Sequence, residues 1–201
     1  MLIIGLTGPS GAGKGLISTL FARYGVPSLD TDAIYHELIS PPSACLDELV
    51  EAFGKSILTP DAKLDRRALS EMVFDEGHEE DLRKLNTITH RHVLDEVRRR
   101  LNGYREAGVA AVLVDAPQLF ESGYDRECDK ILSVLASRGL RLTRIMERDG
   151  LDRAHAEARL NAAMPDEFFV CHSNAIITND GDISAAEAAV RRLLQDWGVT
   201  P

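Results

Sequence analysis

The sequence has 201 residues, a net charge of −9, 44% apolar residues and 27% charged residues. This length suffices for one compact α/β domain with a sizeable core and a small inserted subdomain. The acidic balance argues against a nucleic-acid partner, which requires a basic face, but a small anionic substrate needs only a local cluster of Lys and Arg.

The N-terminal part of the chain alternates between strand and helix patterns. An apolar run over residues 2–7 predicts a strand that ends in a glycine-rich turn. Apolar side chains then repeat at helical spacing from Leu16 to Phe21, and Gly25 is a helix stop. Residues 26–30 predict a second short strand.

A long connection of about residues 31–105 follows the second strand. It has helical patterns at 44–53, 66–74 and 80–101 and no clear strand. A plain crossover between parallel strands needs only a dozen or more residues. The connection therefore predicts an inserted helical subdomain.

Three later apolar runs, at residues 110–114, 131–135 and 175–177, predict buried strands that alternate with helical stretches. A helical region over 140–173 is broken at Pro165, and residues 184–197 predict a closing amphipathic helix. This alternation predicts an α/β fold whose mostly parallel sheet is covered by helices on both faces.

The three cysteines lie far apart and form no CxxC pair, so neither a disulfide framework nor a zinc site is indicated. We expect Cys45, Cys128 and Cys171 to be small buried or half-buried hydrophobes. The N-terminal apolar run is much shorter than the ~20 residues of a membrane span and has no basic region before it. We expect no membrane partner and a cytoplasmic location.

The most specific motif is G-x-x-x-x-G-K over residues 8–14, directly after a strand and at the start of a helix. Glycines let backbone N–H groups converge on phosphate oxygens, and the helix N-terminus adds its dipole. Lys14 can reach the β- and γ-phosphates. The alternative, a glycine-rich turn without ligand, is disfavoured by this context. The motif predicts an ATP site made by Gly8, Gly11, Ala12, Gly13, Lys14, Gly15 and Leu16.

The position after Lys14 is Gly15, where the motif usually has a Ser or Thr that holds Mg²⁺. Water could take that coordination place, because Mg²⁺ usually keeps several waters. Asp115, at the end of the third predicted strand, fits the Walker-B role of a magnesium ligand. It could instead cap a turn before Pro117, and we favour the magnesium role.

Asp32 lies at the end of the second predicted strand, and the carboxyl ends of strands face the ligand crevice in open α/β sheets. A carboxylate there can accept the proton of an attacking hydroxyl. Alternatively Asp32 is the N-cap of the following helix, and both roles can hold at once.

Arg141, Arg144 and Arg148 recur at i, i+3 and i+7, which places them in one stripe on a helix. Kinases use such arginines to stabilise phosphoryl charge and to close over ATP. The alternative is a solvated helix face with Glu147 and Asp149 as partners, which spacing alone favours.

Nearly end to end, the chain resembles the dephospho-coenzyme A kinase family, which phosphorylates the ribose 3′-hydroxyl of dephospho-CoA. The resemblance is carried, in order, by IIGLTG, LDTDAI, KLDRRALSEMVF, ITH, DAPQLFESG, RIMERDGL, EARLNAAMP and IITNDG. It implies an ATP-dependent kinase with a P-loop NTPase-type core, a helical substrate domain and a mobile lid. We expect one domain over residues 1–201, with its core at 1–30, 106–139 and 174–201, the helical insertion at 31–105 and the lid at 140–173.

The resemblance also implies roles for individual residues. Asp32 would be the general base, and Lys14, Arg144 and Arg148 would serve the phosphates. Nucleotide-binding roles extend to Arg159 in the lid and Asn179 near the adenine. The substrate side would include Asp65, Arg66, Arg67 and His90. A metal site at His90 and His92 is not expected, because residues at i and i+2 point apart on a helix.

The chain departs from the family pattern at Gly15, Arg91, Gln118 and Ala163, and at residues 168–170, where the family is often basic. Three functions therefore stay open: dephospho-CoA phosphorylation, phosphorylation of another nucleoside, nucleotide or hydroxylated metabolite by a divergent paralogue, and nucleotide binding without catalysis. In each case the expected partner is a small molecule, and the expected assembly is a monomer or weak homo-oligomer.

Overall fold

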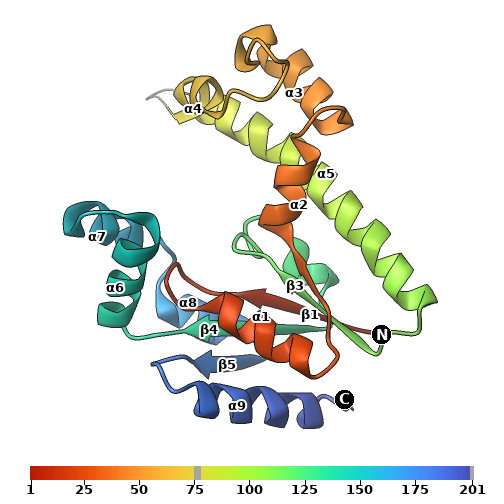
Figure 1. Ribbon diagram of the computed structural model, residues 1–201, viewed down its shortest axis with the longest axis vertical. Helices are drawn as coiled ribbons and strands as arrows, with labels where there is room; N and C mark the ends of the chain where they lie inside the picture. The colour runs from red at the N-terminus through yellow and green to blue at the C-terminus, as the bar shows by residue number, and fades with distance from the viewer. Residues whose placement is uncertain (75–77, 200–201) are drawn as a thin grey trace. The chain divides into compact units, whose positions relative to one another are not determined.

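The computed structural model describes residues 1–74 and 78–199, and it contains a five-stranded sheet whose paired strands are all parallel (Figure 1). The strand order is β2-β3-β1-β4-β5. The strands are β1 (Leu2–Thr7), β2 (Ser28–Asp30), β3 (Ala111–Asp115), β4 (Lys130–Leu135) and β5 (Ala175–Thr178). The predicted parallel α/β sheet is therefore confirmed, and β1 lies at its centre.

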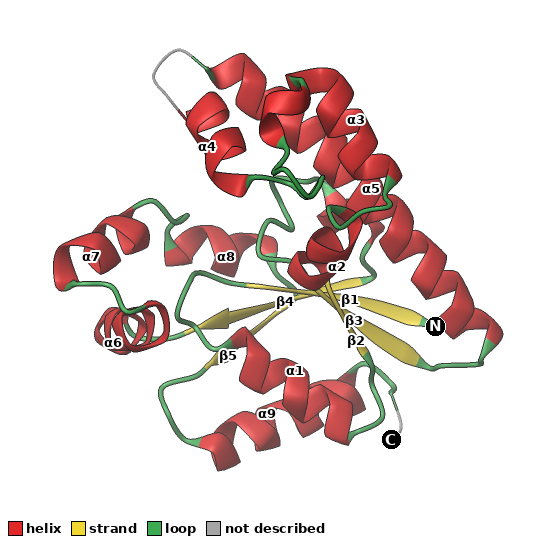
Figure 2. Ribbon diagram, turned by 45° about the horizontal axis from the view of Figure 1, so that its top comes forward, coloured by secondary structure: helices red, strands yellow, loops and turns green. Residues whose placement is uncertain are grey.

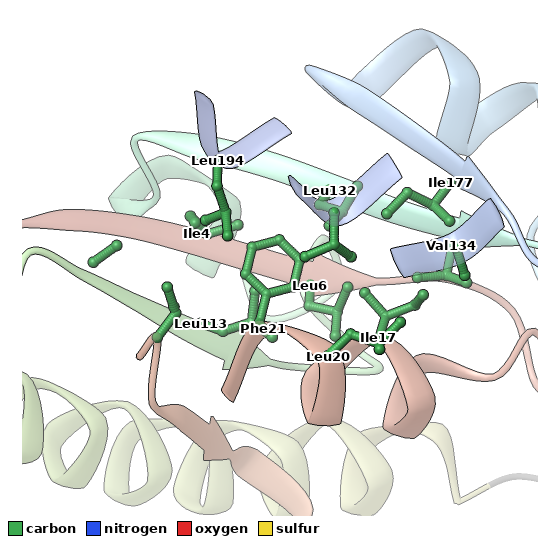
Figure 3. Packing of buried hydrophobic residues seen from close by; sticks show 14 of the residues in the cluster. Ile4, Leu6, Ile17, Leu20, Phe21, Leu113, Leu132, Val134, Ile177 and Leu194 are labelled. Atoms are coloured by element: carbon green, nitrogen blue, oxygen red, sulfur yellow. The ribbon is translucent and has the colours of Figure 1, made fainter. Parts of the chain in front are cut away.

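The main core lies between this sheet and two helices, α1 (Lys14–Arg23) and α9 (Ile183–Asp196), which pack on one of its faces (Figure 2). Figure 3 shows the Phe21 ring at the centre of this core, among side chains of β1, β3 and β4. Ile17, Leu20 and Phe21 of α1 are all completely buried. Their i, i+3, i+4 spacing gives the helix one apolar face, which is why this segment folds as a helix against the sheet.

The second strand is shorter than the predicted 26–30. The N–H of Val26 donates to the carbonyl of Phe21, and Pro27 has no N–H to donate. The Pro27 carbonyl does accept from Leu113, but the ladder proper starts at Ser28. Turn geometry after α1 thus delays the strand by two residues.

The region predicted as a second helical excursion contains α6 (Arg138–Asp149), α7 (Arg153–Asn161) and α8 (Asp166–His172). Asp152 caps α7 by accepting from the His155 N–H at 2.9 Å, and Pro165 immediately precedes α8. α6 and α7 share a small core centred on Ile145. α8 packs against β4 on the side of the sheet opposite α1 (Figure 2).

The chain divides into two compact units: residues 1–30 with 104–201, and residues 31–103. The second unit is helical and has its own apolar core, which includes Leu49, Ile57 and Ile88. Its elements are α2 (Thr31–Leu38), α3 (Ala44–Phe53), the 3-10 turn η1 (Lys55–Ile57), α4 (Arg66–Phe74) and most of α5 (Glu79–Glu106). The helices predicted at 44–53 and 66–74 match these bounds, whereas α5 is longer than the predicted 80–101.

The cysteines differ from one another in burial. Cys45 is buried and Cys128 is half-buried, as expected, and burial raises the pKa of their thiols to about 11 and about 12. The expectation was wrong for Cys171, which is exposed. It lies two residues after Phe169, the buried residue of the short helix α8, and positions i and i+2 face different sides of a helix.

Candidate functional site

The phosphate loop connects β1 to α1 and packs closely against residues that are distant from it in sequence. Gly13 has φ 92°, and a Cβ placed on it would lie 2.2 Å from Nδ2 of Asn179. A Cβ on Gly8, whose φ is 141°, would lie 2.2 Å from the carbonyl oxygen of Val134. Both positions therefore require glycine for backbone conformation and for close approach. This packing holds the loop at the carboxyl end of β1, in the middle of the sheet.

Lys14 and Asp115 lie together at that edge. The Nζ of Lys14 is 3.9 Å from Oδ1 of Asp115, and the side chains are 17% and 15% exposed. Ser18, one turn into α1, donates from Oγ to Oδ2 of Asp115 at 3.3 Å. Asp115 pairs in register with Leu6 of β1, which explains why a residue so distant in sequence reaches the loop. A carboxylate, an ammonium and a hydroxyl thus converge beside the phosphate loop.

The side chains of two arginines of α6 contact backbone carbonyls of the phosphate loop rather than solvent. Nε of Arg141 donates to the Ser10 carbonyl at 3.2 Å, and its NH1 is 2.8 Å from Oδ1 of Asp166. NH1 of Arg144 donates to the carbonyl of Gly11 at 3.2 Å. The side chain of Arg141 is only 7% exposed. The solvated-face alternative is therefore wrong for these two arginines.

Arg148 and Arg159 both bind the carboxylate of Asp149, the last residue of α6. Arg148 donates to both oxygens of Asp149 at 2.7 and 2.9 Å, and Arg159 donates to Oδ2 at 2.7 Å. The hydrogen bond from Arg148 is the main reason that the pKa of Asp149 is lowered. Both arginines are about half exposed, and ion pairs with this exposure contribute little to stability.

Asn179, predicted near the adenine, is 3% exposed and lies directly under the loop. Its side-chain Nδ2 donates to the Ala12 carbonyl at 2.9 Å, and its backbone carbonyl accepts from NH2 of Arg144 at 3.1 Å. The side chain is therefore already engaged with the loop backbone. Its proximity to adenine remains a prediction.

In the helical unit, Asp32 lies in the first turn of α2 and is exposed. The helix begins at Thr31, so Asp32 is inside the helix rather than at the N-cap position of the alternative interpretation. His36, one turn further on, has its Nδ1 2.9 Å from NH2 of Arg66. His36 was not among the predicted site residues, although its i, i+4 spacing from Asp32 places the two residues on one side of the helix.

The other predicted substrate residues have structural partners in the same unit. Oδ1 of Asp65 accepts from the backbone N–H groups of Arg67 and Ala68, so Asp65 caps the start of α4. The side chain of Arg67 binds Glu71 one turn later. His90 is half-buried on α5. Their substrate roles remain predictions.

The departure from the family at Arg91 has a local explanation. Arg91 and His92 both bind Oε2 of Glu48, and these hydrogen bonds, that of His92 foremost, lower the pKa of Glu48. The pair therefore ties α5 to α3 within the helical unit. Residues 1–74 and 78–199 contain no group of three or more His, Cys, Asp or Glu side chains able to hold a metal ion.

At residues 168–170, where the family is often basic, this chain has aromatic side chains that contact one another and Phe120. The rings of Phe168 and Phe120 meet edge to face with centroids 5.1 Å apart, and His172 stacks on Phe168 at 4.1 Å. Phe169 is buried next to them. Aromatic packing thus fixes α8 where a basic side chain would stay in solvent.

A glycine-rich loop between a central parallel strand and a helix, with its lysine beside a strand-end carboxylate, defines a protein of the P-loop NTPase class. Comparison with known proteins narrows this class. The sequence profile of the dephospho-CoA kinase family matches residues 2–185. The chain belongs to the dephospho-CoA kinase family.

Individual relatives agree with this assignment. The chain is 35% identical to a dephospho-CoA kinase of Carboxydothermus hydrogenoformans, covering 97% of this chain and 94% of the relative. It is 36% identical to one of Moorella thermoacetica, over 98% and 92% of the two chains. Among solved structures, dephospho-CoA kinase from Campylobacter jejuni matches with a TM-score of 0.70 and 25% identity, over 97% and 96% of the chains. TT1252 from Thermus thermophilus matches with a TM-score of 0.78 and 31% identity, covering 97% of each chain.

A more distant likeness concerns the fold alone. Shikimate kinase from Acinetobacter baumannii matches with a TM-score of 0.54 and 19% identity, over 98% of this chain and 93% of that one. No helix among the described residues is both long enough and apolar enough to span a bilayer.

Proposed function

We propose that this protein transfers the γ-phosphate of ATP to the ribose 3′-hydroxyl of dephospho-CoA, yielding coenzyme A. The observation that carries the proposal is the pairing of Lys14 with Asp115 beside the G-x-x-x-x-G-K loop, in a chain that matches the family over nearly its whole length. A kinase of this kind needs little covalent chemistry from the protein, because phosphoryl transfer depends mainly on positioning the reactants and on neutralising charge.

In this proposal cationic side chains bind the phosphates and a carboxylate accepts the proton of the acceptor. Lys14 contacts the β- and γ-phosphates, and Arg148 and Arg159 exchange Asp149 for phosphate oxygens when ATP binds. Asp32 accepts the proton of the 3′-hydroxyl as general base. Asp65, Arg66 and His90 form the acceptor side, with His36 beside Arg66.

Magnesium fits the loop edge. Asp115 supplies one carboxylate, and a side chain at Gly15 would meet nothing within 4 Å, which leaves room for coordinated water. The ion, when bound with ATP, neutralises developing charge on the β- and γ-oxygens. The chain's own part is to hold the Asp115 carboxylate through Ser18.

The proposal is tested by turnover of purified protein with ATP, Mg²⁺ and a panel of acceptors. We expect coenzyme A to appear by mass spectrometry with dephospho-CoA, and no product with a 3′-deoxyribose analogue. Adenosine, AMP and shikimate serve as competing acceptors. A higher kcat/KM for one of these would favour the divergent-paralogue alternative, and ATP binding without any turnover would favour the binding-module alternative.

Gly15→Ser tests the magnesium arrangement. Space is open at this position, and serine is a better helix residue than glycine by about 0.5 kcal/mol, so we expect a folded and slightly more stable protein. The new hydroxyl should lower the Mg²⁺ concentration needed for half-maximal ATP binding. Gly139→Ser is a matched control, because Gly139 is also the second residue of its helix and also has open space. An unchanged Mg²⁺ requirement in Gly15→Ser would argue against metal at this position.

A further inference from the structure

Side chains from outside the phosphate loop donate hydrogen bonds to the backbone carbonyl oxygens of three consecutive loop residues. Arg141 holds the carbonyl of Ser10, and Arg144 holds that of Gly11. The carbonyl of Ala12 accepts from Nδ2 of Asn179 at 2.9 Å and from NH1 of Arg144 at 3.4 Å. The donors come from α6 and from the end of β5, two elements distant from the loop in sequence.

These hydrogen bonds determine which way the loop peptides face. In a planar trans peptide the carbonyl and the N–H of the next residue point in opposite directions. Because the carbonyls of Ser10 and Ala12 accept hydrogen bonds from side chains of α6, the N–H groups of Gly11 and Gly13 point away from α6. The peptide between them is tied at both ends, because the N–H of Ala12 donates to the Pro9 carbonyl.

The loop approaches this support closely. A Cβ on Gly11 would lie 2.7 Å from the carbonyl oxygen of Arg141, and one on Gly13 would meet Asn179. Asn179 and Arg141 are buried, at 3% and 6% exposure. The Oδ1 atom of Asn179 is buried with no hydrogen-bond partner among the described residues. A buried unpaired acceptor lowers the stability of the folded protein, so this amide has a cost in stability.

We propose that Arg141, Arg144 and Asn179 are positioning residues of the phosphate site. They act on ATP through the loop backbone: each removes a carbonyl dipole from the side that faces phosphate and thereby presents N–H groups there. In this proposal Arg144, which was expected to serve the phosphates directly, acts through the backbone, since NH1 donates to the carbonyl of Gly11 and NH2 to the carbonyl of Asn179. Arg141 also links the loop to α8 through Asp166.

The role differs from a direct phosphate contact in one measurable way. A loop that cradles the β-phosphate serves ADP and ATP alike, whereas a γ-phosphate ligand serves ATP alone. Substitution by lysine keeps the positive charge but removes the planar guanidinium group, which spans two carbonyls in Arg144 and a carbonyl and a carboxylate in Arg141. We therefore expect Arg144→Lys and Arg141→Lys to weaken binding of ADP and ATP by the same factor, about tenfold for the loss of a charge-assisted hydrogen bond.

Calorimetric titration with ADP and with a non-hydrolysable ATP analogue measures this factor. Arg138→Lys is the matched control on the same helix, since Arg138 binds Asn161 and no loop residue. The KM for dephospho-CoA should stay within twofold in all three variants, whereas a general structural defect would change it too. Asn179→Ala, if folded by circular dichroism, should show the same equal loss for ADP and ATP.

Two results would overturn the proposal: ADP affinity unchanged in both Arg144→Lys and Arg141→Lys, or a loss for the ATP analogue at least tenfold larger than for ADP. The inference rests on the proposed nucleotide site but not on the acceptor, because the titrations contain no acceptor. Failure of the unmodified protein to phosphorylate dephospho-CoA while it binds ADP would refute the proposed acceptor and leave this inference to be decided by the variants.

Discussion

Replacing Lys14 by methionine is expected to lower kcat/KM for ATP by about 10²–10³, the usual effect of removing one preorganised donor from a site of developing charge. Methionine keeps the length and apolar stem of the side chain but has no ammonium group to face the β- and γ-phosphates. Nζ of Lys14 is 3.9 Å from Oδ1 of Asp115, which is longer than a hydrogen bond, and Asp115 keeps the hydrogen bond from Ser18 when the ammonium is removed. The variant should therefore fold normally.

The measurement is steady-state kinetics at saturating dephospho-CoA, with thermal unfolding recorded in parallel. Lys55→Met is the matched control, because Lys55 is exposed in the helical unit and no role in the site is assigned to it. A Lys14→Met enzyme within fivefold of the unmodified kcat/KM would refute the phosphate role of Lys14.

Replacing Asp32 by asparagine is expected to lower kcat by about 10²–10⁴, the range for loss of a positioned general base. Asparagine is the same size but cannot accept the proton of the attacking hydroxyl. Binding of ADP should be unchanged, because the proposed role of Asp32 is toward the acceptor hydroxyl and not toward the nucleotide. The effect should therefore be in kcat and not in nucleotide affinity.

Asp47→Asn is a suitable control: Asp47 is exposed and also lies in the first turn of a helix of the same unit, so it reproduces the loss of charge near a helix N-terminus. If Asp32 is the base, the acid limb of the kcat against pH profile should disappear in Asp32→Asn and persist in Asp47→Asn. Equal kcat values for Asp32→Asn and the unmodified protein would instead refute the role of Asp32 as general base.

Much of the fold follows from local patterns. The strands at the sheet centre are continuous apolar runs, typical of strands buried on both faces. The helices at 44–53 and 66–74 are amphipathic, and their bounds could be predicted without knowledge of their neighbours. Element ends were harder: Pro27 and the turn after α1 shortened β2, and α5 continues to Glu106, past the end predicted at residue 101.

For the site, the sequence alone determined the phosphate loop, because glycine spacing and a following lysine encode the chemistry locally. Only the tertiary structure decided what the arginines of α6 do. Their spacing is equally suited to a solvated face, and nothing local reveals that the phosphate loop lies against them. The burial of Arg141, the backbone contacts of Arg144 and the place of Asn179 under Ala12 all arise from packing between segments more than a hundred residues apart in sequence. Such long-range contacts depend on the order of strands in the sheet, which local periodicity does not contain.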